Sequence, residues 1–203
     1  MKPIGIVTAT RWEAAPLIKA FGFQRIEKNL WKTQAEGAVV FLCLSGVGQK
    51  AARAAALRLC QNGAKELISA GFCGALVPEL HVGDLVTHRL LTVDTPVRTA
   101  AERRALTAKT QPIAVDMETQ AIIEAGTLRG VPIRACRIVS DELEEDLTPL
   151  FGSDAWFRPW KIALRLLNPA VWPLAKRLRK NILIASDRLV TEIRTCLQTP
   201  AAR

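Results

Sequence analysis

The sequence predicts an α/β fold in which helices cover both faces of a mostly parallel, mixed central sheet. Short apolar segments rich in β-branched residues alternate with helical segments between residues 3 and 141, and this alternation is typical of parallel sheets with helical crossovers. The chain has 203 residues, of which 49% are hydrophobic, and this is enough for the core of one large domain. We therefore expect a three-layer sandwich.

The first half of the chain supplies most of the predicted strands. Residues 3–9 and 38–45 are apolar runs closed by small residues, as buried strands are. Residues 48–63 are rich in alanine and end at a glycine, which predicts a helix. Residues 65–76 and 82–88 predict two further strands.

The second half begins with a predicted helix at 118–130 and a strand at 131–141. Residues 150–198 read as helices interrupted by three prolines, Pro159, Pro169 and Pro173. The predicted organisation is an α/β domain at 1–150, followed by a basic helical C-terminal extension at 151–203 that packs on the same domain.

The charge distribution points to an anionic partner. The net charge is +9, and the stretch from Trp156 to Ser186 has no acidic residue. Its tryptophans, leucines and cations in residues 156–180 are typical of an interfacial helix on an anionic membrane surface. The alternative is that these helices close the core while their Lys and Arg side chains extend into water. We expect no nucleic-acid partner, because no nucleic-acid-binding motif accompanies the charge.

Cysteine usage and the N-terminus favour a cytoplasmic protein, or one bound peripherally to the inner membrane surface. The five cysteines are odd in number and mostly lie in apolar segments, which suits reduced core thiols. The first residues show neither an apolar signal region nor a cleavage site. Only two histidines are present, so we expect no metal.

Candidate reactive residues cluster at the ends of predicted strands. Glu13 follows the first strand, the glycine turns 45–48 and 71–74 follow the next two, and Asp141 ends the last. Met117 and Glu118 lie at the start of a helix. In open α/β sheets, ligands bind beyond the carboxyl ends of the strands, so these segments are expected to meet in one crevice.

Each of these residues also has a purely structural explanation. Glu13 suits the first turn of a helix, where its charge complements the helix dipole. The Ser-Gly turn at 45–48 and Asp141 suit helix capping, and Met117 suits a core gap. We assign Asp116 to capping. The acidic residues after Asp141 are typical of a solvated face.

Taken together and in order, five motifs resemble the nucleoside phosphorylase and nucleosidase superfamily. They are IGIVTATRWEA (4–14), LSGVGQKAARAAA (44–56), ISAGFCGALVPELHVGDLV (68–86), AVDMETQAI (114–122) and VPIRACRIVSDELEED (131–146). Within the superfamily, the chain is most similar to the hopanoid-associated phosphorylase group, on the segments 95–119, 140–149 and 158–181. That group implies removal of adenine from adenosylhopane to leave ribosylhopane.

The resemblance implies a role for each motif. Asp141 would protonate the purine, and Glu13 would activate water. Glu118 would hold the ribose hydroxyls, since a carboxylate can accept from two adjacent hydroxyls, and Met117 would lie against the sugar. The other residues implied in substrate binding are Arg11, Ser45, Gly46, Phe72, Cys73, Gly74 and Ser140. No cofactor is implied.

Water is favoured over phosphate as the acceptor. Ser69 and Phe72 occupy the positions at which phosphorolytic relatives carry an arginine and a serine, so phosphate as a co-substrate would depend on Arg11 and the backbone of 45–48. The chain is also shortened in the middle, with only residues 89–94 where relatives carry a base-stacking loop.

Three alternatives stay open: a soluble purine nucleoside phosphorylase, a methylthioadenosine or S-adenosylhomocysteine nucleosidase, and a non-catalytic nucleoside-binding relative. Self-association into a homo-oligomer is expected from the resemblance.

Overall fold

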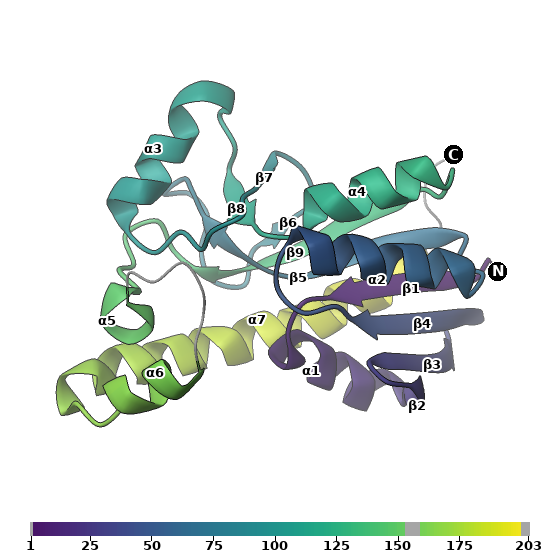
Figure 1. Cartoon of the computed structure of the whole chain (residues 1–203), viewed down its shortest axis with the longest axis horizontal. Helices are drawn as coiled ribbons and strands as arrows, with labels where there is room; N and C mark the ends of the chain where they lie inside the picture. Colours follow the sequence, from purple (N-terminus) through teal and green to yellow (C-terminus); the bar gives the residue numbers. More distant parts are fainter. Residues whose placement is uncertain (1, 153–158, 200–203) are drawn as a thin grey trace.

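The computed structural model describes residues 2–152 and 159–199, and within them it forms a three-layer α/β sandwich (Figure 1). In this part of the chain the central sheet has nine strands. Its main path runs β2-β3-β4-β1-β5-β8-β7, and β9 pairs with both β5 and β6. The fold class predicted from the sequence is confirmed.

Four parallel strands form the middle of the sheet: β1 (Ile4–Thr8), β4 (Ala38–Leu44), β5 (Glu66–Ala75) and β9 (Ile133–Asp141). β1 lies between β4 and β5, and β9 pairs with the other edge of β5. Each coincides with a predicted strand. Their apolar side chains are buried on both faces of the sheet, which explains the continuous hydrophobic runs in the sequence.

The remaining strands are short or antiparallel. β2 (Gln24–Glu27) and β3 (Leu30–Ala35) form a hairpin that extends the sheet from β4. β8 (Ala114–Asp116) pairs antiparallel with β5, and β7 (Leu90–Thr92) pairs parallel with β8. The predicted strand at 82–88 was too long. Only β6 (Leu85–Val86) forms, because the preceding residues make a turn closed by the Asp84 carboxylate and the His81 amide.

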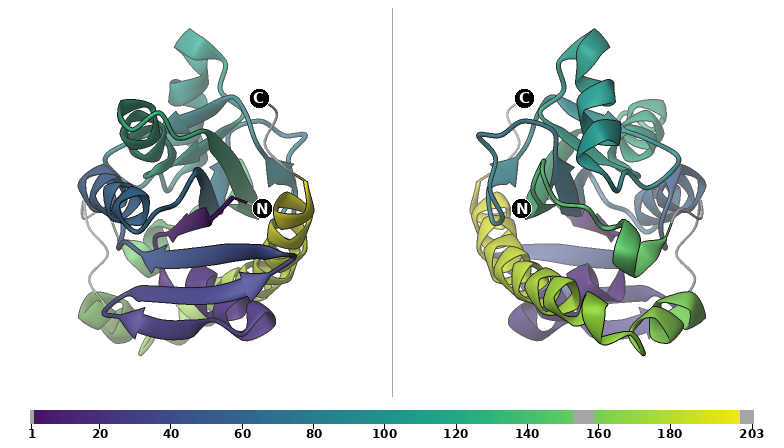
Figure 2. Two further views of the ribbon diagram at one scale, coloured as in Figure 1. Left: turned by 90° about the vertical axis from the view of Figure 1, so that its right-hand side faces the viewer. Right: turned by 90° about the vertical axis from the view of Figure 1, so that its left-hand side faces the viewer.

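Two helices pack on each face of the sheet, as Figure 2 shows. α2 (Gln49–Gln61) and α4 (Thr119–Leu128) cover one face, whereas α1 (Arg11–Phe21) and α7 (Trp172–Gln198) cover the other. α3 (Ala100–Thr110) lies beyond the end of the sheet near β7 and β8. The short α5 (Thr148–Phe151), α6 (Pro159–Arg165) and η1 (Pro169–Val171) lead into α7.

The C-terminal helix α7 contributes directly to the main core. Ala185, Leu189, Ile193 and Leu197 recur every four residues and are buried against the sheet, which is the pattern of an amphipathic helix. Pro169 begins η1 and Pro173 lies in the first turn of α7, so these prolines start helical segments rather than interrupt one. Trp156 and Arg158 lie outside the described residues, as do the side chains of Trp160 and Lys161.

Candidate functional site

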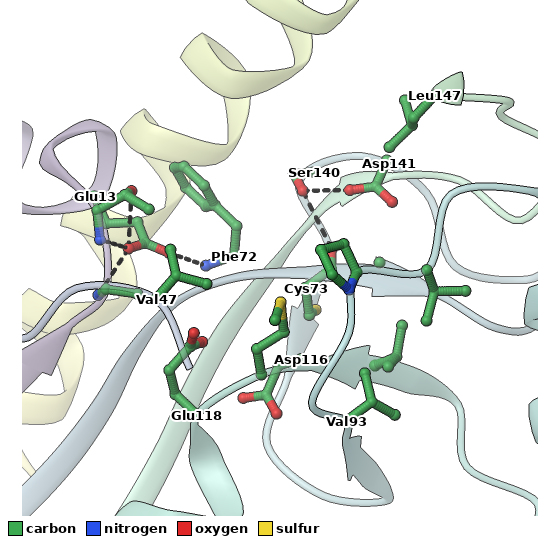
Figure 3. Close-up of a pocket in the computed structure, with 17 residues that line it drawn as sticks. Glu13, Val47, Phe72, Cys73, Val93, Asp116, Glu118, Ser140, Asp141 and Leu147 are labelled. Carbon is green, nitrogen blue, oxygen red and sulfur yellow. Dashed lines mark hydrogen bonds between the residues drawn. The ribbon is translucent and has the colours of Figure 1, made fainter. Parts of the chain in front are cut away.

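Segments from distant parts of the sequence enclose a cavity of about 210 Å³ at the carboxyl ends of the parallel strands (Figure 3). Glu13 comes from the first turn of α1, Phe72 to Gly74 come from β5, and Ser140 and Asp141 come from β9. Met117 and Glu118 connect β8 to α4. The full lining is Ala9, Thr10, Glu13, Val47, Phe72, Cys73, Gly74, Val93, Pro96, Val97, Val115, Asp116, Met117, Glu118, Ser140, Asp141 and Leu147.

Glu13 is buried and almost saturated with hydrogen bonds. Its Oε2 accepts from the amides of Ala9 (3.0 Å) and Thr10 (2.6 Å) and from the Thr10 hydroxyl (3.0 Å). Its Oε1 accepts from the amide of Phe72 at 2.9 Å. Each carboxylate oxygen has about two lone-pair positions, and Oε1 accepts only the Phe72 amide, so it can accept one further donor from the cavity. Glu13 therefore caps α1 through Oε2 and accepts a single hydrogen bond from the protein at Oε1.

Glu118 forms one side of the cavity and is held by two partners. Its Oε1 accepts from the amide of Gly48 at 2.9 Å, and its Oε2 lies 3.3 Å from Nη1 of Arg137. Burial raises the pKa of Glu118, the Arg137 guanidinium opposes this shift, and the charge of Glu13 adds to it. The glycine turn at 45–48 thus donates an amide to a protein carboxylate.

Arg137 lies on β9 and is fully buried next to the cavity. Burial lowers its pKa, but the nearby carboxylates of Asp116, Glu118 and Glu13 raise it more, so the net shift is upward. Its Nε lies 3.1 Å from Asp116 Oδ2, and its Nη2 donates to the Ser69 hydroxyl at 2.9 Å. One buried cation therefore holds together the carboxylates on this side of the site.

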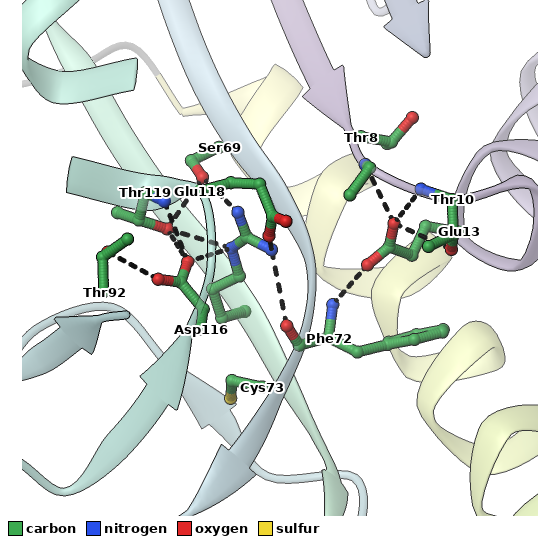
Figure 4. Close-up of polar contacts among 12 residues, drawn as sticks. Thr8, Thr10, Glu13, Ser69, Phe72, Cys73, Thr92, Asp116, Glu118 and Thr119 are labelled. Atoms are coloured by element: carbon green, nitrogen blue, oxygen red, sulfur yellow. Dashed lines mark hydrogen bonds and ion pairs between the residues drawn. The ribbon is translucent and has the colours of Figure 1, made fainter. Parts of the chain in front are cut away.

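Asp116 completes this network, shown in Figure 4. Its Oδ2 accepts from the Thr119 amide at 3.0 Å, at the start of α4, and its Oδ1 accepts from the Thr92 hydroxyl at 2.6 Å. This geometry agrees with the capping role assigned from the sequence. The Phe72 peptide links the two halves of the site, because its amide donates to Glu13 and its carbonyl accepts from Arg137.

Asp141 lies at the opposite end of the cavity. Its Oδ1 accepts from the Ser140 hydroxyl at 2.6 Å, and its Oδ2 accepts from Nη2 of Arg103 at 2.5 Å. A Cβ added to Gly74 would lie 2.8 Å from the same Oδ2. The carboxylate therefore packs directly on the β5 backbone, and only glycine leaves it room.

The three glutamates after Asp141 have partners of their own. Glu142 lies 3.3 Å from the His81 ring, and Glu144 pairs with Arg104. Glu145 lies 3.0 Å from Nε of Arg177 on α7, and burial together with the charge of Asp141 raises its pKa. In the described residues, no group of His, Cys, Asp or Glu side chains is arranged to hold a metal ion.

The cavity has an apolar wall, in which Leu147 lies beside Asp141 (Figure 3). Val93, Pro96 and Val97 come from the segment between β7 and α3, and Leu147 comes from the loop after β9. The Leu147 amide donates to the Arg98 carbonyl at 2.9 Å, which holds the two segments together.

The structure brings together eight of the predicted site residues and leaves three outside the cavity. Ser45 donates its hydroxyl to the carbonyls of Thr8 and Gly46, so the Ser-Gly turn is used within the backbone. Arg11 is exposed and lines a separate depression with Arg25 and Trp31. The prediction that Arg11, Ser45 and Gly46 line the site is therefore corrected.

Sequence reasoning missed Arg137, Arg103 and the apolar wall. Arg137 could have been recognised, because it lies between Cys136 and Ile138 in a strand that is expected to be buried, and a buried charged side chain must be paired. Nothing in the sequence distinguishes Arg103, since helix 100–110 carries several similar charged residues.

Comparisons with known proteins agree with this architecture. Residues 3–89 match the family model described as Phosphorylase superfamily. The S-adenosylhomocysteine nucleosidase of Streptococcus pyogenes has a TM-score of 0.75 and 17% identity, over 97% of this chain and 96% of that one. The 5'-methylthioadenosine nucleosidase variant of Helicobacter pylori, solved with 5'-methylthioadenosine, has a TM-score of 0.69 and 16% identity. The match covers 96% of this chain and 99% of that one.

Futalosine hydrolase of Helicobacter pylori has a TM-score of 0.64 and 16% identity, over 94% of this chain and 98% of that one. No curated protein matches the sequence. The family match covers residues 3–89, and along almost the whole chain the fold is similar to that of these nucleosidases.

Proposed function

We propose that the protein is a nucleosidase that hydrolyses the N-glycosidic bond of an adenosyl compound and releases adenine. The observation that carries the proposal is the placement of three carboxylates, Glu13, Glu118 and Asp141, around one cavity. Cleavage of this bond develops positive charge on the sugar and negative charge on the leaving base. Carboxylates favour the first, and a proton donor is needed for the second.

In the proposed reaction, water attacks the anomeric carbon while the bond from that carbon to the base nitrogen breaks. Glu13 takes the proton of the attacking water through the free position on Oε1. Asp141 supplies a proton to the purine, which leaves as neutral adenine. Glu118 holds the ribose hydroxyls, and its charge stabilises the oxocarbenium-like transition state more than the neutral ground state.

The cavity lining favours water over phosphate. Among the described residues that line the cavity there is no lysine or arginine, and the Gly48 amide of the glycine turn already donates to Glu118. A phosphate ion would lie beside three carboxylates with no cation in contact, which is electrostatically unfavourable. Phosphorolysis is therefore the weaker alternative.

The finer proposal is that the adenosyl compound is a lipid, adenosylhopane, which would be converted to ribosylhopane. The support from this structure is the surface at the start of α7. Leu164, Leu166, Leu167 and Trp172 are exposed there, together with Lys176, Arg177, Arg179 and Lys180. Arg177 pairs with Glu145, but exposed apolar side chains beside several cations suit an anionic membrane surface. None of the described helices is long and apolar enough to cross a bilayer.

Adenine release tests the activity. The purified protein is incubated with adenosylhopane, methylthioadenosine and S-adenosylhomocysteine, each with and without phosphate. We expect release without phosphate, and loss of release in both Asp141→Asn and Glu13→Gln. A strict phosphate requirement would establish the phosphorylase. Folded wild-type protein that binds adenine without turnover would establish the non-catalytic relative.

Vesicle co-sedimentation tests the lipid surface. We expect the wild type to sediment with anionic phosphatidylglycerol vesicles but not with neutral phosphatidylcholine vesicles. The paired change Leu167→Ser and Trp172→Ser should abolish sedimentation while methylthioadenosine cleavage is retained. The matched control, Leu128→Ser, removes an exposed leucine on the opposite face at the end of α4. Equal sedimentation of all three proteins with phosphatidylglycerol vesicles would refute the proposal that this surface binds the membrane.

A further inference from the structure

We propose that Arg103 on α3 is a positioning residue that fixes the carboxyl group of Asp141 for proton donation to the leaving base. This inference rests on the proposed nucleosidase function. It assigns a positioning role to a helix that lies outside the five superfamily motifs and does not line the cavity.

The contacts of Arg103 are directed at the end of β9. Its Nη2 donates to Asp141 Oδ2 at 2.5 Å, and its Nη1 donates to the carbonyl of Asp141 at 3.3 Å and to that of Glu142. A planar guanidinium that contacts both the side chain and the main chain of one residue fixes that residue's rotamer. With the Ser140 hydroxyl on Oδ1, both oxygens of Asp141 are held.

The position of α3 is itself well defined. Thr99 caps the helix by accepting from the Glu102 amide, and the Glu102 carboxylate accepts in return from the Thr99 amide at 3.0 Å. The Arg98 carbonyl, just before this cap, accepts from the Leu147 amide at 2.9 Å. The first turn of α3, which carries Arg103, is thereby tied to the loop that follows Asp141.

Burial argues that the arginine is kept for a purpose other than stability. The side chain of Arg103 has no exposed surface, against 14% for Asp141, and its Nε has no hydrogen-bond partner in the described part of the chain. A buried donor without a partner costs about 1–3 kcal/mol, and apolar replacements of buried ion pairs are often as stable or more so. A core selected for stability alone would favour an apolar residue here.

The helix offers a matched control. Arg104 is adjacent, exposed by 59%, and pairs with Glu144, which is exposed by 66%. Both arginines have acidic partners in the same loop, but only Arg103 contacts Asp141. Arg104→Met therefore removes an equal charge from the same helix without touching the proton donor.

The experiment compares two leaving groups. Adenine needs a proton to depart, whereas 4-nitrophenolate from 4-nitrophenyl riboside departs without one. We expect Arg103→Met to lower kcat on the nucleoside by about 10²–10³-fold, within the range for a general acid, and to change kcat on the nitrophenyl riboside by less than about threefold. Arg103→Lys should recover part of the loss, and Arg104→Met should match the wild type on both substrates.

A double-mutant cycle tests whether Arg103 acts through Asp141. In an Asp141→Asn background, Arg103→Met should cause no further loss, because both changes remove the same interaction. Equal losses on both leaving groups, or an additive loss in that background, would overturn the proposal and leave Arg103 a structural residue.

Failure of the proposed function gives a different result. Wild-type protein would then cleave neither substrate, and adenine binding measured by calorimetry decides the positioning role. Weaker adenine binding in Arg103→Met than in Arg104→Met would support the role of Arg103, and equal binding would refute it.

Discussion

Glu118 and Arg137 form a buried ion pair beside the cavity, with 3.3 Å between Oε2 and Nη1. The same guanidinium lies 3.1 Å from Asp116, and Glu13 adds to the negative potential around it. Arg137 therefore forms ion pairs with Asp116 and Glu118 and lies in the field of a third carboxylate, Glu13. The excess negative charge lies where the proposed reaction develops positive charge on the sugar, which favours the transition state.

Removal of the cation from this cluster should destabilise the protein strongly. Arg137→Met leaves Asp116 and Glu118 buried without their ion pair, and loss of one partner of a buried pair costs about 3–5 kcal/mol. Urea unfolding followed by circular dichroism measures the loss. The control is Arg53→Met, which breaks an exposed pair with Glu124 and should cost about 0–1 kcal/mol. Similar losses in both variants would contradict the buried network.

The stability contributed by Glu118 should fall as the pH rises. Burial raises the pKa of Glu118 above its ordinary value of 4.5, so the folded state binds this proton more tightly than the unfolded state. The contribution is fully present below about pH 4.5 and is lost as the pH rises through the folded pKa.

Glu118→Gln does not titrate and removes this dependence. Urea unfolding between pH 4 and pH 8 should therefore show the stability of the wild type, relative to the variant, decreasing with pH. The exposed Glu124→Gln is the control. A difference that is flat or increases with pH would show that Arg137 outweighs burial.

Glu13→Gln should separate the capping role of Glu13 from its role as a base. Glutamine at this position of a helix can still form a capping box, but its amide group would face one of the four donors around Glu13. We expect a stability loss of about 1–3 kcal/mol and a loss in kcat of about 10²–10⁴-fold. Full activity in a folded variant would remove Glu13 from the mechanism.

A methyl group at Gly74 should disturb Asp141, the proposed proton donor, more than the fold. The added Cβ would lie 2.8 Å from Asp141 Oδ2, which Arg103 holds in place. We expect Gly74→Ala to lower kcat at least about tenfold, since small displacements of a catalytic group are costly. Gly22→Ala is the control: its φ of 63° strains an alanine, but no atom lies within 4 Å, so only its melting temperature should fall.

Cys196 should be the most reactive of the half-buried thiols. A hydrogen bond from Cys136 lowers the pKa of Cys196 to about 7, burial opposes the shift, and Arg134 assists it. Burial instead raises the pKa of Cys60 above 9.0. Because the thiolate is the nucleophile, iodoacetamide should label Cys196 with a midpoint near pH 7 and label Cys60 only at higher pH. Peptide mass spectrometry distinguishes the two labelled cysteines. Equal labelling of both at pH 7 would contradict the hydrogen bond between Cys136 and Cys196.

The sequence by itself predicted the four parallel strands, the helices α2, α4 and α7, and eight of the residues that line the cavity. Apolar runs such as 38–45 are typical of strands buried on both faces, and Asp141 and Glu118 were placed at a strand end and a helix start. These features are local, because hydrophobic periodicity and the residues that end helices and strands depend on neighbours in the sequence.

Tertiary structure alone decided how the charges are paired. Arg137 meets Glu118, and Arg103 meets Asp141, across pairings that bring together distant segments of the chain. The sequence shows each charge but not its partner, because a guanidinium suits any carboxylate equally and only the packing of β9 and α3 selects one. For the same reason Ser45 and Arg11 suited a ligand site in the sequence, whereas the fold directs the first to the backbone and the second to a separate surface depression.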